Sequence, residues 1–178
     1  MHSDIIEFWF DETGPNQWWG KDPAFDQSIR LRFGHLHNAA IHCALFRWRK
    51  QPEGRLAEII VLDQFSRNMF RDQPQAFTQD SLALALSQEA ITQGIEQSLC
   101  PVQRSFLYMP FMHSESLEIH DIAVELFERN GIESTLEFEL QHRQIIERFG
   151  RYPHRNKILR RESTPEEIEF LKQPNSSF

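Results

Sequence analysis

The chain has 178 residues, of which fifteen are Phe and four are Trp, and its formal net charge is −7. A chain of this length is expected to form one domain, residues 1–178, which buries a hydrophobic core without disulfide or metal support. The acidic balance argues against nucleic acid or an anionic membrane surface as a partner, and no apolar run approaches the roughly 20 residues of a membrane-spanning helix.

Helix start and stop signals recur along the chain, whereas no segment shows the strict alternation of a half-buried strand. Asp22-Pro23 is typical of a helix start, and Ser134–Glu137 and Thr164–Glu167 fit the capping box. Three glycines follow helical patterns and are expected to end them in a left-handed conformation: Gly94, Gly131 and Gly150. The sequence therefore predicts an all-α fold, with helices near residues 3–10, 23–33, 35–48, 53–70, 80–93, 101–109, 115–130, 134–149 and 165–172.

The first residues give no sign of a secretory signal, because Met1 to Phe10 has no basic stretch and no small-residue cleavage site. We therefore expect a cytoplasmic protein. Its cysteines, Cys43 and Cys100, are far apart and form no paired motif, so we expect both to be reduced and buried. Between the first two helices lies the irregular segment 11–21, which carries Trp18 and Trp19.

The helix at 53–70 is apolar almost all round, which is typical of a buried helix. Asp63 and Arg67 nevertheless lie four residues apart on its most apolar arc, so they form a predicted ion pair inside the core. This pair is either a structural tie between helices or the floor of a cleft, with Asp63 orienting Arg67. Asn68 and Arg71 follow and extend the polar surface in the second interpretation.

Pro110 is expected to break or kink the helix that begins near residue 101. His113 and Glu115 come just after it and are candidates for acid–base work. The alternative is a purely local role, in which Ser114 or Ser116 caps the next helix.

The helix at 134–149 carries His142 inside an apolar stripe. This residue is either a hydrogen-bonded core histidine or a candidate acid or base. Glu139 and Arg143 form a second predicted i,i+4 ion pair beside it. Glu139 and His142 also have the Glu-x-x-His spacing of helical di-iron proteins, but those proteins need two such motifs and further carboxylates, so no metal site and no cofactor are predicted.

The segment 149–156 presents several polar side chains from a short loop that Gly150 and Pro153 constrain: Arg151, His154, Arg155 and Asn156. Arginines bind carboxylate or phosphate in a bidentate manner, and rigid loops are where binding residues concentrate. Guanidinium groups after a helix also stabilise its free carbonyls, so both interpretations stay open. The wider segment 141–161 holds seven Lys or Arg side chains and one acid.

Several of these stretches resemble the bacterial family catalogued as domain of unknown function 924. The resemblance rests on Ile5–Phe10 with Trp18-Trp19, on Leu62–Arg71, on Arg104–Glu115, on His142–Asn156 and on Ser163–Leu171. It implies an all-α fold of antiparallel helical hairpins in a tetratricopeptide-like superhelical arrangement. It implies no activity and assigns no catalytic residue.

Two functions compete at this point. The first is a binding module whose Arg- and His-lined cleft holds an anionic small molecule or a peptide carboxylate. Its candidate residues are Asp63, Arg67, Asn68, Arg71, Arg143, Arg151, Arg155 and Asn156, with Trp18 and Trp19 as apolar walls. The second is a cofactor-free enzyme that acts on a small anionic substrate, with the acid or base among His113, Glu115, His142 and His154. It requires these groups to meet in one pocket, whereas a third, structural interpretation makes them all ties between helices.

Overall fold

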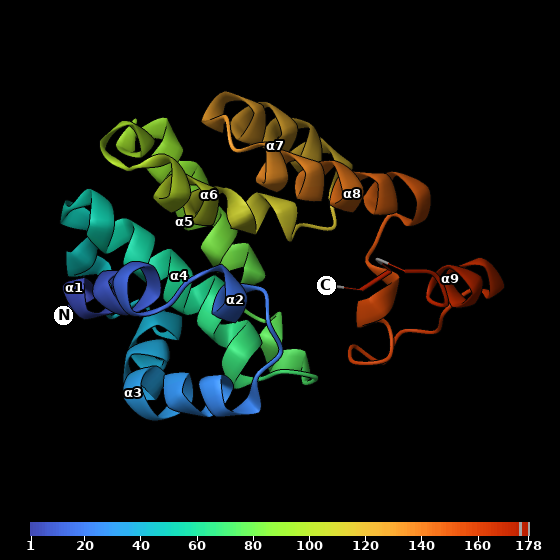
Figure 1. Ribbon diagram of the computed structural model, residues 1–178, viewed down its shortest axis with the longest axis horizontal. Helices are drawn as coiled ribbons and strands as arrows, with labels where there is room; N and C mark the ends of the chain where they lie inside the picture. Colours follow the sequence, from blue (N-terminus) through green and yellow to red (C-terminus); the bar gives the residue numbers. More distant parts are fainter. Residues whose placement is uncertain (175, 178) are drawn as a thin grey trace.

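The computed structural model describes residues 1–174 and 176–177, and within them the chain is helical, with no strand. The nine α-helices of this part are α1 His2–Glu7, α2 Pro15–Trp18, α3 Pro23–Ile41, α4 Pro52–Met69, α5 Asp80–Thr92, α6 Pro101–Met112, α7 Leu117–Asn130, α8 Glu133–Phe149 and α9 Pro165–Phe170 (Figure 1). A π-helical stretch covers Phe8–Glu12, and 3-10 helices cover Phe46–Lys50, Pro74–Ala76, Ile95–Ser98 and Pro153–Arg155. The predicted all-α fold is confirmed.

The central element is α4, which packs against α1, α3, α5 and α6. It is buried along nearly its whole length, as its all-round apolar sequence predicts. The large buried rings of Trp9, Phe65 and Phe106 meet against it, with the Phe65 and Phe106 centroids each 5.6 Å from that of Trp9. No helix in the described residues is both long and apolar enough to cross a membrane.

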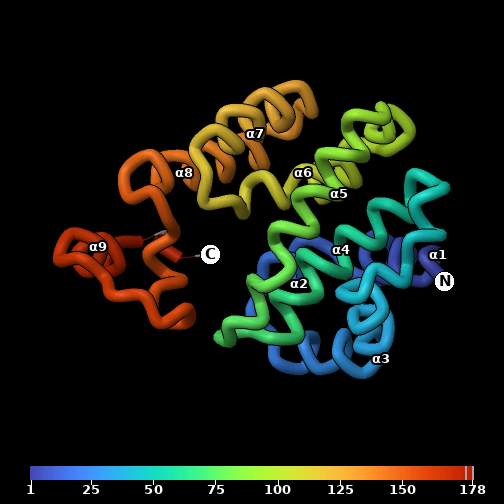
Figure 2. Tube along the Cα trace, turned by 180° about the vertical axis from the view of Figure 1, so that it is seen from behind, coloured from blue at the N-terminus to red at the C-terminus, as the bar shows by residue number. Residues whose placement is uncertain are grey.

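The chain runs on from α6 through α7 and α8, which pack one on the next, and then turns into the 150–161 loop and α9. A second, smaller core holds this end together, with Ile145, Ile146 and Tyr152 buried beside Phe149 and Phe170. Seen from behind, α9 lies at the end of the molecule opposite α1 (Figure 2). The loop between α8 and α9 reaches back to α5 and to the end of α6, because Arg155 contacts Asp80 and the carbonyl of His113.

Most of the predicted helix ends are confirmed. The carboxylate of Asp22 accepts a hydrogen bond from the N–H of Ala24 at 2.8 Å, and Thr164 and Glu167 form the reciprocal bonds of a capping box. The three glycines adopt the left-handed conformation, with φ of 70° at Gly94, 77° at Gly131 and 66° at Gly150. The box predicted at Ser134 is wrong, because α8 already begins at Glu133.

The predicted helices 23–33 and 35–48 are wrong in their division. One helix, α3, runs through Gly34 to Ile41. A glycine inside a helix costs about 1 kcal/mol relative to alanine, and this cost does not interrupt a helix whose apolar face is buried. The chain then turns at Cys43, whose φ is 54°, before the 3-10 helix Phe46–Lys50.

Three local predictions need correction. Pro110 does not end its helix, because α6 continues to Met112. The segment 11–21 is not wholly irregular, since it contains α2. Cys43 and Cys100 are free thiols but exposed, because Cys43 lies in the turn after α3 and Cys100 precedes the first residue of α6, outside the buried faces of both helices.

Candidate functional site

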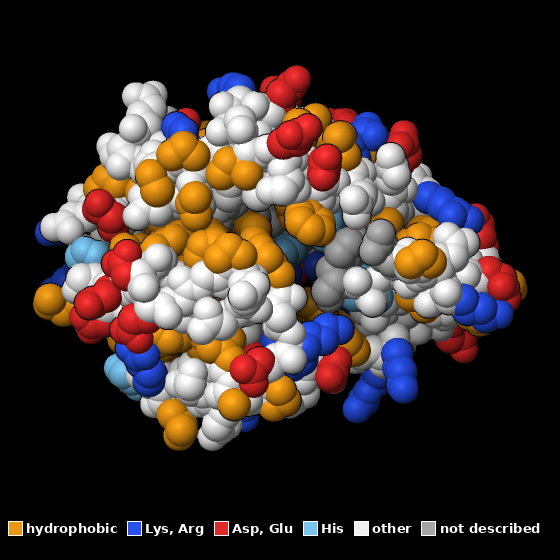
Figure 3. Space-filling view, viewed as in Figure 1, with side chains coloured by type: hydrophobic (Ala, Val, Ile, Leu, Met, Phe, Trp, Pro, Cys, Tyr) orange, Lys and Arg blue, Asp and Glu red, His pale blue; other side chains and the backbone are white. Residues whose placement is uncertain are grey.

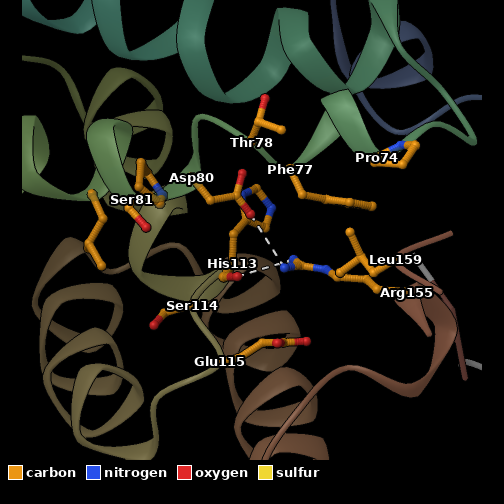
Figure 4. A pocket seen from close by; sticks show the side chains of 12 residues that line it. Pro74, Phe77, Thr78, Asp80, Ser81, His113, Ser114, Glu115, Arg155 and Leu159 are labelled. Atoms are coloured by element: carbon orange, nitrogen blue, oxygen red, sulfur yellow. Dashed lines mark hydrogen bonds and ion pairs between the residues drawn. The ribbon is translucent and has the colours of Figure 1, made fainter. Parts of the chain in front are cut away.

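A cavity of about 330 Å³ opens where the start of α5, the end of α6 and the 150–161 loop meet. Its walls combine apolar and polar side chains: Pro74, Phe77, Thr78, Asp80, Ser81, Leu84, Pro110, His113, Ser114, Glu115, Arg155 and Leu159 (Figure 4). Three residues predicted from sequence, His113, Glu115 and Arg155, therefore line one cavity. They come from two segments about forty residues apart in the chain.

The buried carboxylate of Asp63 on α4 lies behind His113. Its Oδ1 is 2.8 Å from Nδ1 of His113 and 3.0 Å from Nη1 of Arg67. Its Oδ2 accepts a hydrogen bond from Nε2 of Gln64 at 2.6 Å. The predicted Asp63–Arg67 pair is thus present in the core, and its aspartate also holds the imidazole that faces the cavity.

The pair belongs to a closed ring of polar contacts. Arg67 donates to both carboxylate oxygens of Asp80, at 2.9 and 3.0 Å. Arg155 contacts Asp80 through Nη1 at 3.3 Å and donates through Nη2 to the backbone carbonyl of His113 at 3.1 Å. The ring therefore passes through Asp63, Arg67, Asp80, Arg155 and His113, and it ties α4, α5, α6 and the 150–161 loop together.

The charges of this ring determine the state of its histidine. Two aspartates balance two arginines, so a protonated imidazole would add an unbalanced positive charge to a buried group. Burial and the nearby Arg67 accordingly lower the pKa of His113. Burial alone would raise the pKa of Asp63, but Arg67 and His113 outweigh it and hold that pKa below its usual range. An ionised carboxylate only accepts, so Nδ1 of the neutral His113 carries the proton and donates it to Asp63.

The second nitrogen of His113 is then a proton acceptor. Within the described residues no side chain or carbonyl hydrogen-bonds to Nε2, and 14% of the side chain is exposed. An imidazole oriented by a carboxylate through one nitrogen, with the other nitrogen unprotonated, is the arrangement of a general base.

Arg155 is the cation of the cavity wall. Its guanidinium packs over the rings of Phe77 and Tyr152, with its central carbon 4.6 and 4.5 Å from their centroids. Only 6% of the residue is exposed, and its buried Nε has no hydrogen-bond partner among the residues that the structure describes. Burial and the charge of Arg67 lower its pKa. The long contacts to Asp80 and His113 therefore leave much of its hydrogen-bonding capacity unused.

Glu115 forms the opposite wall. Arg161 binds its carboxylate in a bidentate manner at 2.6 and 2.9 Å, and the N–H of Tyr152 donates to Oε1 at 2.8 Å. Burial alone would raise the pKa of Glu115, but the bond from Arg161 outweighs it and lowers that pKa. Asn156 supports this pair from behind, because it is buried and accepts a hydrogen bond from Nε of Arg161 at 3.0 Å.

A second buried network stands behind Tyr152. The Tyr152 hydroxyl donates to the carbonyl of Met112 at 2.5 Å and lies 3.1 Å from Nε2 of His120. Nδ1 of His120 lies 2.6 Å from Glu139, whose pKa is raised by burial. Glu139 therefore pairs with His120 on α7, and the predicted Glu139–Arg143 pair is wrong.

The other two candidate histidines lie on the same side as this network. His142 is buried, and its Nδ1 is 2.6 Å from the carbonyl of Phe138, the local contact expected of a core histidine. The rings of His142 and His154 lie 5.7 and 5.5 Å from that of Tyr152. Burial lowers the pKa of His142 and of His154 to about 3. Neither residue is among those lining the cavity.

Four polar candidates have other partners. Asn68 and Arg71 both bind Asp26 of α3 and line a separate cavity of about 270 Å³. Arg143 pairs with Asp121 and Glu147 on the surface of α7 and α8. Arg151 binds Glu167 of α9 through two bonds, at 2.7 and 2.8 Å, and thereby fastens α9 to the end of α8.

The tryptophans belong to an aromatic cluster instead. Trp18 and Trp19 both pack on Phe106, with ring centroids 5.0 and 5.8 Å away. Trp19 is half exposed, and so is Phe138, whose ring lies 6.5 Å from that of Trp19. Figure 3 shows hydrophobic side chains across the middle of this face, beside a hollow in which histidine is visible.

Sequence analysis missed several residues of the site: Phe77, Asp80, His120, Tyr152 and Arg161. Asp80 carried no signal beyond an acid at a helix start, because its role depends on how α5 packs against α4. His120 did carry one, since it shares a helix face with the buried Ala123 and Phe127. No group of three or more His, Cys, Asp or Glu side chains in the described residues is arranged to hold a metal ion.

Residues 5–175 match the model of a family described as bacterial protein of unknown function (DUF924). The solved structure of protein of unknown function ATU0120 from Agrobacterium tumefaciens is similar, with 41% sequence identity, 96% of each chain covered and a TM-score of 0.92. No curated protein matches the chain. The residues of the cavity all lie within the matched range.

Proposed function

This chain belongs to the bacterial family of unknown function DUF924, and we propose that its cavity binds a small molecule through an anionic group. The observation that carries the proposal is Arg155, a buried guanidinium in the cavity wall with an unpartnered Nε. A carboxylate or phosphate on the ligand would supply the acceptors that this guanidinium lacks, in the bidentate geometry that arginine favours.

The ring of polar contacts supports this role. Phe77 and Tyr152 both pack against the guanidinium of Arg155, which restrains its rotamer before a ligand arrives. The cavity volume of about 330 Å³ suits a small molecule or the end of a peptide chain. We place this binding activity in the cytoplasm. The tetratricopeptide-like arrangement of the helical hairpins stays a prediction.

A thermal-shift screen with small carboxylates and inorganic phosphate tests the proposal. A ligand at one hundred times its dissociation constant adds about 2.7 kcal/mol, which raises the melting temperature by several degrees in a protein of this size. We expect Arg155→Gln to lose this shift. Arg148→Gln is the matched control, because Arg148 belongs to the same basic segment but pairs with Glu166 at the surface. A shift that survives in Arg155→Gln would contradict the proposal.

The second candidate function is a cofactor-free enzyme that acts on the anionic ligand. The hydrogen bond from His113 to Asp63 favours it, because this bond leaves Nε2 of a neutral imidazole available to take a proton. Asp63 would act as a positioning residue, since it contacts the imidazole and not the cavity.

Esters that carry a free carboxylate, such as the 4-nitrophenyl monoester of succinate, test this function. We expect hydrolysis to rise with pH, with a midpoint below the ordinary histidine value near 6.5, and to fall by about 10²–10⁴-fold in His113→Gln. Asp63→Asn should shift the midpoint of the pH profile, an effect that a purely structural role would not produce. Equal rates in the wild type and His113→Gln would exclude this function.

A further inference from the structure

The wall of the cavity carries negative charge as well as positive charge. Asp80 and Glu115 line it together with Arg155, and they reach it from α5 and from the segment before α7 (Figure 4). Both carboxylates are partly exposed, at 18% and 27% of the side chain. A ligand that is only anionic would meet Arg155 but would also lie near two like charges, which is unfavourable in a partly buried site.

Each carboxylate is paired with an arginine outside the cavity lining. Arg67 binds Asp80 through two bonds, and Arg161 binds Glu115 through two bonds. These arginines fix the orientation of the carboxylates but do not consume every acceptor position, because each carboxylate oxygen can accept about two hydrogen bonds. Oδ1 of Asp80 and Oε2 of Glu115 accept one bond each from the described residues.

The rest of the lining is largely apolar. Pro74, Phe77, Leu84, Pro110 and Leu159 form a hydrophobic surface between the charged groups. A ligand that satisfies the whole wall therefore needs an anion for Arg155, a cation for the carboxylates and a short apolar part. From this combination, and resting on the proposed anion binding, we infer that the cavity takes a small zwitterion of the amino-acid type with an apolar side chain.

Three matched probes test the inference by isothermal titration calorimetry on the unaltered protein. L-leucine carries both charges, 4-methylpentanoate lacks the ammonium group, and 3-methylbutan-1-amine lacks the carboxylate. We expect L-leucine to bind at least tenfold more tightly than either analogue. Tenfold corresponds to about 1.4 kcal/mol, within reach of one charge-assisted contact.

A variant that fills the cavity locates the binding. Ser81→Phe places a ring at an exposed position of the cavity wall on α5, and Gln88→Phe places the same ring at an exposed position of α5 outside the lining. We expect Ser81→Phe to abolish L-leucine binding and Gln88→Phe to retain it. The ranking of the three probes on the unaltered protein does not depend on how either variant folds.

The outcomes separate this inference from the function on which it rests. Binding of 4-methylpentanoate as tight as that of L-leucine overturns the zwitterion and leaves anion binding standing. Binding of the amine alone overturns both. Retention of L-leucine binding in a folded Ser81→Phe variant overturns the location and with it the inference. If none of the three probes binds, the inference fails, and the screen with small carboxylates and phosphate decides the fate of anion binding.

Discussion

The last turns of α4 and the turn that follows them contribute side chains to two polar regions on different sides of the helix. Asp63 and Arg67 point toward α5, α6 and the cavity that His113 lines. Asn68 and Arg71 point toward α3 and bind Asp26 there. Asn68 separates from Arg67 because consecutive helical residues are rotated by about 100°. Arg71 lies beyond the end of α4 at Met69, so it does not continue the helix face that carries Asp63 and Arg67.

The two regions differ in how completely their charges are paired. In the α3 region one carboxylate, Asp26, receives two bonds from Arg71 at 2.6 and 2.8 Å and one from Asn68 at 2.8 Å. No histidine lines its cavity. In the α5–α6 region, within residues 1–174 and 176–177, His113 presents a nitrogen without a partner, and Arg155 has a buried donor without one. Among the described residues, Asp26, Asn68 and Arg71 have no buried side-chain nitrogen or oxygen without a partner, which indicates a tie between helices. Polar atoms without a partner at a cavity wall instead indicate a place for a ligand.

Removing the carboxylate from each region should have the largest effect and should separate the two. Asp63→Ala removes one of the two carboxylates that balance Arg67 and Arg155, which leaves the buried ring with an uncompensated positive charge, so we expect a loss of about 3–5 kcal/mol in the free energy of unfolding. Asp26→Ala breaks a more exposed group, and we expect a loss of about 1–3 kcal/mol. Urea unfolding of both variants at pH 7 measures the difference. Equal losses would show that the two regions are energetically alike.

Acidification should lower the free energy of unfolding through the buried histidines near Tyr152 and the cavity. The pKa of His142 and that of His154 lie at about 3 in the folded state, below the ordinary value near 6.5, and the pKa of His113 is also lowered. Above pH 6.5 both states are neutral, so these groups have no effect. As the pH falls below 6.5, the unfolded chain takes up protons that the folded chain refuses, and stability decreases by up to about 1.4 kcal/mol per pH unit for each histidine.

Urea unfolding between pH 7 and pH 5 tests this sign, because most carboxylates stay ionised in that window in both states. Glu139 acts in the opposite direction, since burial raises its pKa in the folded state. We expect a continuous loss of stability on acidification and a shallower loss in His142→Gln. His37, buried between α3 and α4, also has a pKa lowered by burial and supplies part of the remaining slope. A stability that rises from pH 7 to pH 5 would refute the neutral state of these histidines.

The first half of the site was predictable because it lies within one helix. Helical periodicity alone places Asp63 and Arg67 together on an apolar face, and the structure has them 3.0 Å apart. It also places His142 in a buried stripe. The same rule failed for Glu139, whose partner His120 lies on another helix at 2.6 Å. A partner within one turn can be found from spacing, whereas a partner across a helix interface depends on packing.

The second half of the site depends on that packing. Arg155 reaches the carbonyl of His113 only because the 150–161 loop returns to the end of α6. From the sequence, Arg151 and Arg155 are equally good candidates, and nothing in the letters distinguishes them. In the structure Arg151 instead fastens α9. The helix boundaries failed for a related reason, since burial of α3 carries it through Gly34 despite the local preference of glycine.

Matched amide side chains give a finer comparison of the two regions. Gln64 donates to Asp63 at 2.6 Å, and Asn68 donates to Asp26 at 2.8 Å. We expect Gln64→Ala to lose about 1.5–3 kcal/mol, because a fully buried carboxylate then lacks a donor. We expect Asn68→Ala to lose less, since Arg71 still gives Asp26 two bonds. Chemical denaturation of both variants checks the order, and a larger loss in Asn68→Ala would contradict it.

A surface ion pair gives a reference value for the free energy of unfolding that the two buried regions should exceed. Arg148 contacts Glu166 at 2.8 Å, with about half or more of each side chain exposed. Water screens such charges and long side chains lose entropy on pairing, so we expect Arg148→Gln to change the free energy of unfolding by less than about 1 kcal/mol. The effect should shrink further in 0.5 M salt, because the screening length falls below about 10 Å. A loss as large as that of Asn68→Ala would contradict this expectation. It would mean that burial adds nothing to the stability that the hydrogen bond between Asn68 and Asp26 provides.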